Sequence, residues 1–278
     1  MYQFFVDDCQ IGKEYVTITG SDVNHIKNVL RMRPGEKIRV SSSSRDMFCE
    51  IAELTDDFVQ ADILDEEAPD TELPSQIYLF QGLPKGDRME YIIQKSVELG
   101  VHEIIPVAMK YCVVKLDSKK AGNKVKRWQA ISERAAKQSK RSKIPEVHTV
   151  MSFKEAVVYA KQQDMILVPY ENERGMEATR EALKKVKPGQ SISVFIGPEG
   201  GFSEEEIELL RQDAEVLSLG KRILRTDTAA ICTMSMLMLE LEEGGEFPAQ
   251  SHEEDIEVPE GGFVRRIIVR IKLLPDSD

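Results

Sequence analysis

Apolar and polar residues alternate in the first part of the chain, in runs that predict short β-strands. A single helix interrupts them; it begins at Ser21 or Asp22, which both suit a helix N-cap, and it ends before Pro34. Several short strands at close spacing predict a small β-barrel. The predicted strands are residues 15–19, 37–40, 48–52 and 58–63.

Residues 65–74 are acidic, poor in apolar side chains and broken by proline, which indicates a linker. From residue 77 onward, short apolar runs alternate with amphipathic segments, as in a parallel sheet with crossover helices. The second part is therefore predicted to be an α/β domain. Its predicted strands are residues 77–81, 103–107, 165–168, 192–196 and 216–219, and its predicted helices are 89–99, 123–140, 152–162, 176–185, 204–212 and 229–241.

The last of these helices is apolar on nearly every face between Ala230 and Leu239. A core position and a subunit interface would each bury it, and we expect both. Beyond Glu243 the pattern weakens. Residues 265–274 alternate basic and apolar side chains, which leaves both an extra strand and an unrelated tail open.

The composition is that of a globular protein, with 41% hydrophobic and 31% charged residues, and 278 residues suit about two domains. Four cysteines lie far apart without the spacing of a zinc site, which favours a reducing cytoplasm and no metal. No apolar run approaches the ~20 residues of a membrane span, and the first residues lack the pattern of a signal peptide. We therefore expect a cytoplasmic protein without a membrane partner.

Charge is distributed unevenly. Residues 115–143 contain eleven basic and two acidic residues, a local charge of +9, whereas the whole chain carries −11. A localised basic segment is what the neutralisation of RNA phosphates requires, although a solvated helix face has the same composition.

Two glycine-containing turns each follow a predicted strand, at residues 196–201 and 219–226. Because the carboxyl ends of parallel strands meet at one edge of a sheet, we expect these turns to enclose a ligand pocket, although a glycine turn also occurs without a ligand. Neither a dinucleotide-binding nor a P-loop motif is present. Glu199 and the acidic residues 204–206 would repel phosphate, so we expect a ligand without phosphates, and a positive charge on it would be compatible with the pocket.

The two turns read GPEGGFS at 197–203 and LGKRILRTDTA at 219–229. Together they resemble the bacterial ribosomal RNA small subunit methyltransferase E family, SPOUT-superfamily enzymes that methylate uridine N3. Three further groups of motifs occur in this chain in the same order as in that family. They are HIKNVLR at 25–31, GLPKGD at 82–87 with QKSVELG at 94–100, and QSKRSKIP at 138–145.

The resemblance covers residues 1 to about 243. It implies a PUA-like β-barrel RNA-binding domain (residues 1–68), a linker (69–75) and a parallel-sheet SPOUT methyltransferase domain with a deep trefoil knot (76–243), a rare exception to unknotted topology. It also implies a homodimer. Residues 244–278 form an extension of unknown role, because this segment has no counterpart in the family pattern.

The resemblance further implies that S-adenosylmethionine is the cofactor and that small-subunit ribosomal RNA, or the 30S subunit, is the partner. The cofactor is cationic at its sulfonium and carries no phosphate, in agreement with the pocket described above. The residues expected to bind it are Val168, Pro169, Tyr170, Gly197, Pro198, Glu199, Gly200, Gly201, Leu219, Gly220, Ile223 and Leu224.

Uracil N3 carries a proton in neutral water and becomes nucleophilic only when that proton leaves. We expect Arg225 to stabilise the charge that develops on the uracil oxygens, and Asp227 or Glu199 to accept the proton. Arg225 could instead hold a subunit contact and Asp227 could cap a helix. Asp227 also stands where the family has glutamate, and Gln3 where it has arginine.

The expected RNA-binding residues are basic, and phosphates would be their ligands. They are Arg31, Lys85, Lys140, Arg141 and Lys143. Two other functions compete with uridine methylation. One is a knotted methyltransferase acting on another RNA, such as a transfer RNA ribose, and the other is a non-catalytic ribosome-assembly factor that kept the fold.

Overall fold

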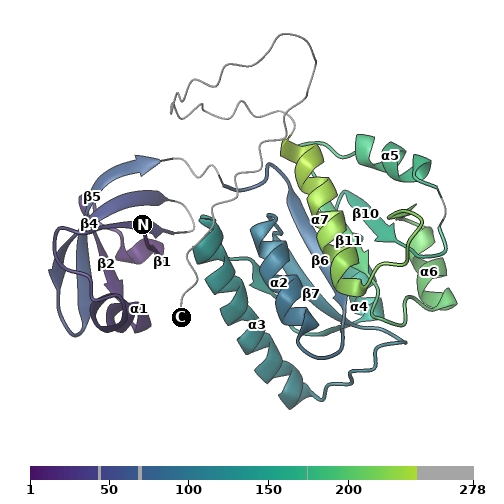
Figure 1. The fold of residues 1–278 in the computed structure, drawn as a ribbon, viewed down its shortest axis with the longest axis horizontal. Coiled ribbons are helices and arrows are strands. Elements are labelled where there is room, and N and C mark those ends of the chain that lie inside the picture. The colour runs from purple at the N-terminus through teal and green to yellow at the C-terminus, as the bar shows by residue number, and fades with distance from the viewer. Residues whose placement is uncertain (43–44, 68–70, 174, 243–278) are drawn as a thin grey trace, which may run out of the picture. The chain divides into compact units, whose positions relative to one another are not determined.

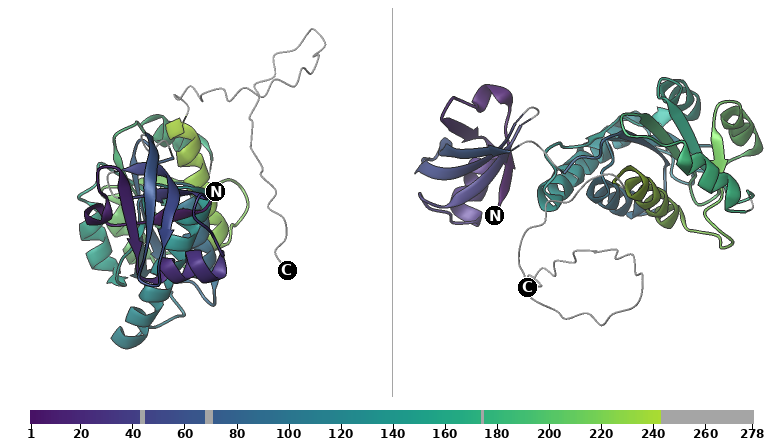
Figure 2. Two further views of the ribbon diagram at one scale, coloured as in Figure 1. Left: turned by 90° about the vertical axis from the view of Figure 1, so that its left-hand side faces the viewer. Right: turned by 90° about the horizontal axis from the view of Figure 1, so that it is seen from above.

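The N-terminal part of the protein is a small sheet whose alternate side chains are buried, as the alternation in the sequence predicts. The computed structural model describes residues 1–42, 45–67, 71–173 and 175–242. In the first two of these ranges the strands run in the order β1-β3-β4-β5-β2 and curl around one apolar core (Figure 2). Their bounds are β1 Gln3–Phe5, β2 Tyr15–Thr19, β3 Lys37–Ser41, β4 Asp46–Leu54 and β5 Phe58–Glu67.

The four strands predicted in this part are present, and the predicted helix is present as α1 (Ser21–Asn24) continued by a π-helical turn, η2 (His25–Val29). Strand β1, which pairs parallel to β3, and the 3₁₀ turn η1 (Asp8–Gln10) were not predicted. The linker predicted from composition at residues 65–74 starts too early in the sequence, because β5 continues its pairing with β4 as far as Glu67.

The second part is a parallel sheet in the order β12-β10-β11-β6-β7-β8, and β9 also pairs with β7 (Figure 1). This confirms the predicted α/β domain; among the described residues, the two-residue strands β8 and β9 were missed. The bounds are β6 Gln76–Gly82, β7 Glu103–Ala108, β8 Glu146–Val147, β9 Met151–Ser152, β10 Met165–Pro169, β11 Ser191–Ile196 and β12 Glu215–Leu217.

All six helices predicted for this domain are present. Helices α2 and α7 pack together on one face of the sheet, and α4 lies on the other (Figure 2). Under α4 the rings of Phe80 and Phe195 stack with centroids 4.5 Å apart. The bounds are α2 Arg88–Glu98, α3 Ser118–Ser139, α4 Phe153–Ala160, α5 Glu177–Lys184, α6 Glu204–Arg211 and α7 Thr226–Glu242.

Helix α3 begins earlier than predicted because Asp117 caps it, with the Lys120 amide donating to Asp117 Oδ1 at 2.8 Å. The predicted extension, residues 244–278, lies outside the described residues. Within the described ranges, no helix is long and apolar enough to cross a membrane.

Candidate active site

The two glycine-containing turns predicted from the sequence lie side by side. Strands β10, β11 and β12 are adjacent and parallel, so the segments that leave their carboxyl ends meet at one edge of the sheet. Residues 169–171, 196–199, 201–202 and 218–226 together line a cavity of about 490 Å³. The turns therefore enclose an open pocket, as their positions after parallel strands predict.

A buried hydrogen-bond chain joins the two turns. The hydroxyl of Thr226, the first residue of α7, donates to the Gly197 carbonyl oxygen at 2.7 Å. The same hydroxyl accepts from Gln81 Nε2 at 2.9 Å, and Gln81 is fully buried at the end of β6. Thus β6, the first turn and the start of α7 are held in one arrangement, and the space between the turns stays open.

Glycine is required at specific points of the first turn. Gly201 has φ +70°, a conformation that favours glycine, and the exposed carboxylate of Glu171 would have to move to make room for a Cβ atom there. A Cβ atom on Gly197 would lie 3.3 Å from the Gly201 backbone. In the second turn Gly220 has φ +106°, and a Cβ atom would meet nothing within 4 Å, so glycine is favoured there by the backbone conformation.

The walls of the cavity combine apolar and charged side chains. Ile223 is 91% exposed although it lines the cavity, so its apolar surface has no partner among the described residues. Burial alone would raise the pKa of Glu199, but the amide of Lys85, which donates to Glu199 Oε1 at 3.0 Å, and the ion pair with Arg88 lower it overall. Glu199 is therefore an ionised carboxylate at neutral pH.

Ten of the twelve residues expected to bind the cofactor line this cavity. They are Pro169, Tyr170, Gly197, Pro198, Glu199, Gly201, Leu219, Gly220, Ile223 and Leu224. Of the other two, Val168 is fully buried in β10, and Gly200 packs against Tyr111, whose Cβ would lie 2.7 Å from a Cβ at that position. Arg88 and Phe202 also line the cavity and were missed; Arg88 is 111 positions from Glu199, the residue of the first turn that it contacts.

Comparison with known proteins identifies the family of this chain. Residues 71–238 match the family model described as an RNA methyltransferase domain, and residues 18–64 match the RNA methyltransferase PUA domain. The ribosomal RNA small subunit methyltransferase E of Bacillus subtilis (strain 168) is 40% identical over 233 residues, which cover 81% of this chain and 90% of that relative. The chain belongs to the ribosomal RNA small subunit methyltransferase E family.

Two solved structures extend the comparison. The ribosomal RNA small subunit methyltransferase E of Neisseria gonorrhoeae, bound to S-adenosyl methionine, is 31% identical and superposes with a TM-score of 0.74, covering 86% of this chain and 97% of that one. A methyltransferase of Legionella pneumophila, in complex with the bound cofactor SAM, is 32% identical with the same TM-score and the same coverage.

The two expected catalytic residues of this methyltransferase E family member are placed differently. Arg225 is exposed and lines the cavity. Asp227 lies in the first turn of α7, outside the cavity lining, and its Oδ1 is buried without a hydrogen-bond partner among the described residues. Glu199, the alternative proton acceptor, lines the cavity.

The expected RNA-binding residues differ in their exposure. Arg31, Lys85 and Lys143 are exposed. Lys140 is half-buried and lies at the end of α3, where its Nζ donates to the Met1 carbonyl oxygen at 2.7 Å. Arg31 and Lys140 both have positive φ angles, of 54° and 63°.

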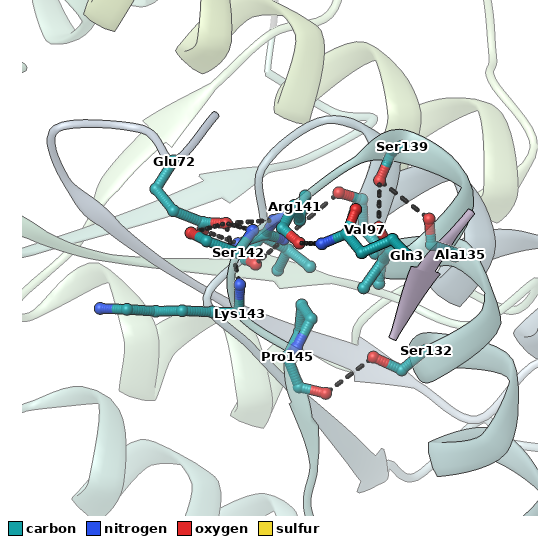
Figure 3. Close-up of polar contacts among 12 residues, drawn as sticks. Gln3, Glu72, Val97, Ser132, Ala135, Ser139, Arg141, Ser142, Lys143 and Pro145 are labelled. Carbon is teal, nitrogen blue, oxygen red and sulfur yellow. Dashed lines mark hydrogen bonds and ion pairs between the residues drawn. The ribbon is translucent and has the colours of Figure 1, made fainter. Parts of the chain in front are cut away.

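Arg141 requires a correction. The residue is 4% exposed and its guanidinium pairs with the Glu72 carboxylate, while its Nη1 donates to the carbonyl oxygens of Val97 at 3.2 Å and Val101 at 2.6 Å (Figure 3). The guanidinium is thus occupied by partners within the protein, which is the arrangement of a structural residue rather than of a phosphate ligand. Gln3 is likewise buried, and its Nε2 donates to Ser41 Oγ and to the Arg141 carbonyl oxygen.

Proposed function

We propose that this protein transfers the methyl group of S-adenosylmethionine to N3 of a specific uridine in 16S ribosomal RNA. The observation that carries the proposal is the cavity formed by the turns at residues 197–201 and 219–225. The names of the relatives support the substrate, and the cofactor bound in two similar structures supports the donor.

The cavity fits this cofactor by its own chemistry. Glycine backbone and the apolar side chains of Ile223 and Leu224 suit a flat, uncharged ring. The ionised carboxylate of Glu199 suits a cation, and neither a P-loop nor a dinucleotide-binding motif is present. When bound, the cofactor supplies an electrophilic methyl group on a sulfonium.

Arg225 is proposed to act on the uracil. Loss of the N3 proton places negative charge on the two carbonyl oxygens of the ring, and a guanidinium at the cavity stabilises that charge. Asp227 or Glu199 would accept the proton: Glu199 lines the cavity but is held by Lys85 and Arg88, whereas Asp227 lies outside the cavity lining and its buried Oδ1 accepts no hydrogen bond from the described residues. The lowered pKa makes Glu199 a weaker proton acceptor than an unperturbed glutamate.

The test compares two arginines of the same turn. Arg225→Ala is expected to lower the turnover rate about 100-fold or more while the affinity for S-adenosylmethionine, measured by calorimetry, stays within a factor of two or three. Arg222→Ala, which removes another exposed cation from the same cavity, is the matched control and is expected to retain turnover. Equal turnover in the Arg225 variant and the parent would remove this residue from the mechanism.

The remaining exposed basic residues are proposed to bind RNA phosphates. Arg31, Lys85 and Lys143 are exposed, and we also propose half-buried Lys140 as an RNA-binding residue. The affinity for rRNA should fall steeply with salt. Replacing Arg31 and Lys143 by glutamine should reduce the slope by roughly 0.7 to 0.9 for each phosphate that the variant no longer neutralises. A salt-independent affinity of the parent protein would contradict this surface.

We further propose that the domain is knotted and that two copies form a cytoplasmic dimer through α7. The strand order β12-β10-β11-β6 requires the chain to cross β10 between β11 and β12, after which α7 returns to pack on α2 and β11. Leu239 on the apolar helix α7 is 55% exposed. Leu239→Glu is expected to give a monomer by light scattering, and a monomeric parent protein would contradict the dimer.

A non-catalytic assembly factor with this fold would bind rRNA but not the methyl donor. Calorimetry with S-adenosylmethionine separates the two functions: binding supports the enzyme, and its absence at millimolar cofactor favours the assembly factor. A methyltransferase acting on a transfer RNA ribose would bind the donor but label another RNA.

A further inference from the structure

A second, smaller cavity lies beside the active site. It has a volume of about 270 Å³, below the ~300–1,000 Å³ typical of drug-sized ligands, so a single ring rather than a whole cofactor suits it. Its walls come from the segment after β6, the start of α2, the segment after β7 and α3. The side chains are mainly apolar and include Leu83, Met89, Val114, Leu116 and Trp128.

The two cavities share a wall. Arg88, the first residue of α2, lines the active-site cavity, whereas its neighbours Asp87 and Met89 line the second one. The same segment is fixed to the active site, because the Lys85 amide donates to Glu199 Oε1 at 3.0 Å. The second cavity is therefore close enough to take a neighbouring residue of a polymer that has one residue in the first.

A lysine lines the second cavity. The Lys124 ammonium lies 5.7 Å from the centre of the Trp128 ring, and no carboxylate pairs with it among the described residues. Around it, Lys119 and Lys126 on α3 and Lys115 just before it are exposed. An apolar slot next to an unpaired ammonium, within a segment of charge +9, is complementary to a base attached to a phosphate.

We propose that this cavity receives a nucleobase of the substrate RNA next to the target uridine, with the Lys124 ammonium against a phosphate of that nucleotide. The inference rests on the proposed function and deepens it. Binding of the unstacked neighbouring base in this cavity offsets part of the cost of opening the RNA strand, which helps the target base to leave its stack and enter the active site.

The fluorescence of one tryptophan can report on binding in this cavity. Trp128 is the only tryptophan of the protein, and it forms part of the wall. The experiment titrates the full-length protein, saturated with S-adenosylmethionine, with a synthetic rRNA fragment that spans the methylated uridine, and records tryptophan emission. The same fragment is then used with a single abasic site at each position flanking the target.

Three variants accompany the parent protein. Val114→Phe fills the cavity, and Lys124→Gln removes the cation from its wall. Lys126→Gln is the matched control, because Lys126 is an exposed lysine of the same helix and does not line the cavity. Calorimetry with S-adenosylmethionine checks that each variant is folded.

We expect RNA to change the Trp128 emission, and one flanking abasic site to weaken binding about tenfold. Val114→Phe and Lys124→Gln should weaken binding of the intact RNA more than Lys126→Gln does. In the Val114 variant, that abasic site should have no additional effect. Lys124→Gln keeps the test decisive should the Val114 variant fail to bind the cofactor.

The inference is overturned if the parent protein methylates the fragment while no flanking abasic site affects binding, or if Lys124→Gln binds as the control does. The proposed function survives that result. A parent protein that neither binds the fragment nor methylates 30S subunits lacking the modification would overturn both.

Discussion

The buried ion pair between Arg141 and Glu72 gives the sharpest prediction about stability. Arg141 follows α3 and Glu72 precedes β6, so the pair holds residues 71–75 against the end of α3 (Figure 3). Glu72 Oε1 also accepts from the amides of Ser142 at 3.1 Å and Lys143 at 3.3 Å. The replacement Arg141→Met keeps the apolar stem of the side chain and removes its charge and all its donors.

The magnitude follows from burial. The side chains of Arg141 and Glu72 are 5% and 20% exposed, so the replacement leaves a largely desolvated carboxylate without its cation. Such a change costs about 3–5 kcal/mol in buried pairs, and the partial exposure of Glu72 favours the lower end, about 3 kcal/mol. Lys143→Met, which removes an exposed cation two residues away, should change the free energy of unfolding by less than about 0.5 kcal/mol.

The effect should depend on pH. Burial alone would raise the pKa of Glu72, but the hydrogen bonds and charge of Arg141 lower it overall. Because the folded pKa lies below the unfolded value of roughly 4.3, this stabilisation is present above that pH and is lost as the pH falls through the folded pKa. In the Arg141 variant the unpaired Glu72 has a raised pKa, so the destabilisation should shrink as the pH is lowered from 7 towards 4.

Urea unfolding followed by the emission of Trp128 measures these free energies, because this buried residue is the only tryptophan. Equal stability of the Arg141 and Lys143 variants at pH 7 would refute the reasoning. A folded Arg141 variant should also keep its affinity for RNA, and a loss of salt-dependent RNA binding without a loss of stability would restore this residue to the RNA surface.

Three further predictions concern the site and the thiols. Gly201→Ala should weaken S-adenosylmethionine binding at least tenfold in calorimetry, because φ is +70° and the methyl group meets Glu171. Thr226→Val removes the hydroxyl that joins the two turns and should weaken the same affinity about tenfold; unchanged binding would show that the turns hold without it. Burial raises the pKa of the Cys49 thiol to about 12, so at pH 8 a thiol reagent should modify exposed Cys9 rapidly and Cys49 only on unfolding; equal rates would contradict the burial.

The parallel sheet and its glycine turns could be predicted because their signals are local. Apolar runs followed by glycine mark buried strands that end at a turn, and β10 and β11 differ from their predicted ranges by one residue each. Strand β1 could not be predicted in this way, because its three residues are held by pairing with β3, more than thirty residues later. The first turn of α7 was missed because Thr226 is fixed by Gly197 and Gln81, which are distant in sequence.

In the site, too, residues with a local sequence signal could be predicted and residues positioned by distant partners could not. The residues within the two turns were predicted from glycine and the family motifs, whereas Arg88 reaches the cavity from a segment that was not predicted to contribute. Arg141 stands in a basic segment and has the local signal of a surface residue. Its partner Glu72 is 69 positions away, and only the tertiary structure shows that the pair is buried. Charge along a sequence therefore identifies a basic segment, but not which of its residues face the solvent.

The position of the transferred methyl group tests the central claim most directly. The protein is incubated with isotopically labelled S-adenosylmethionine and 30S subunits that lack the modification, and the 16S rRNA is digested and mapped by mass spectrometry. We predict one labelled nucleoside, a uridine methylated at N3, and no label with the Arg225→Ala variant under the same conditions. Label on a ribose or on another base, or no label on the rRNA at all, would contradict the account.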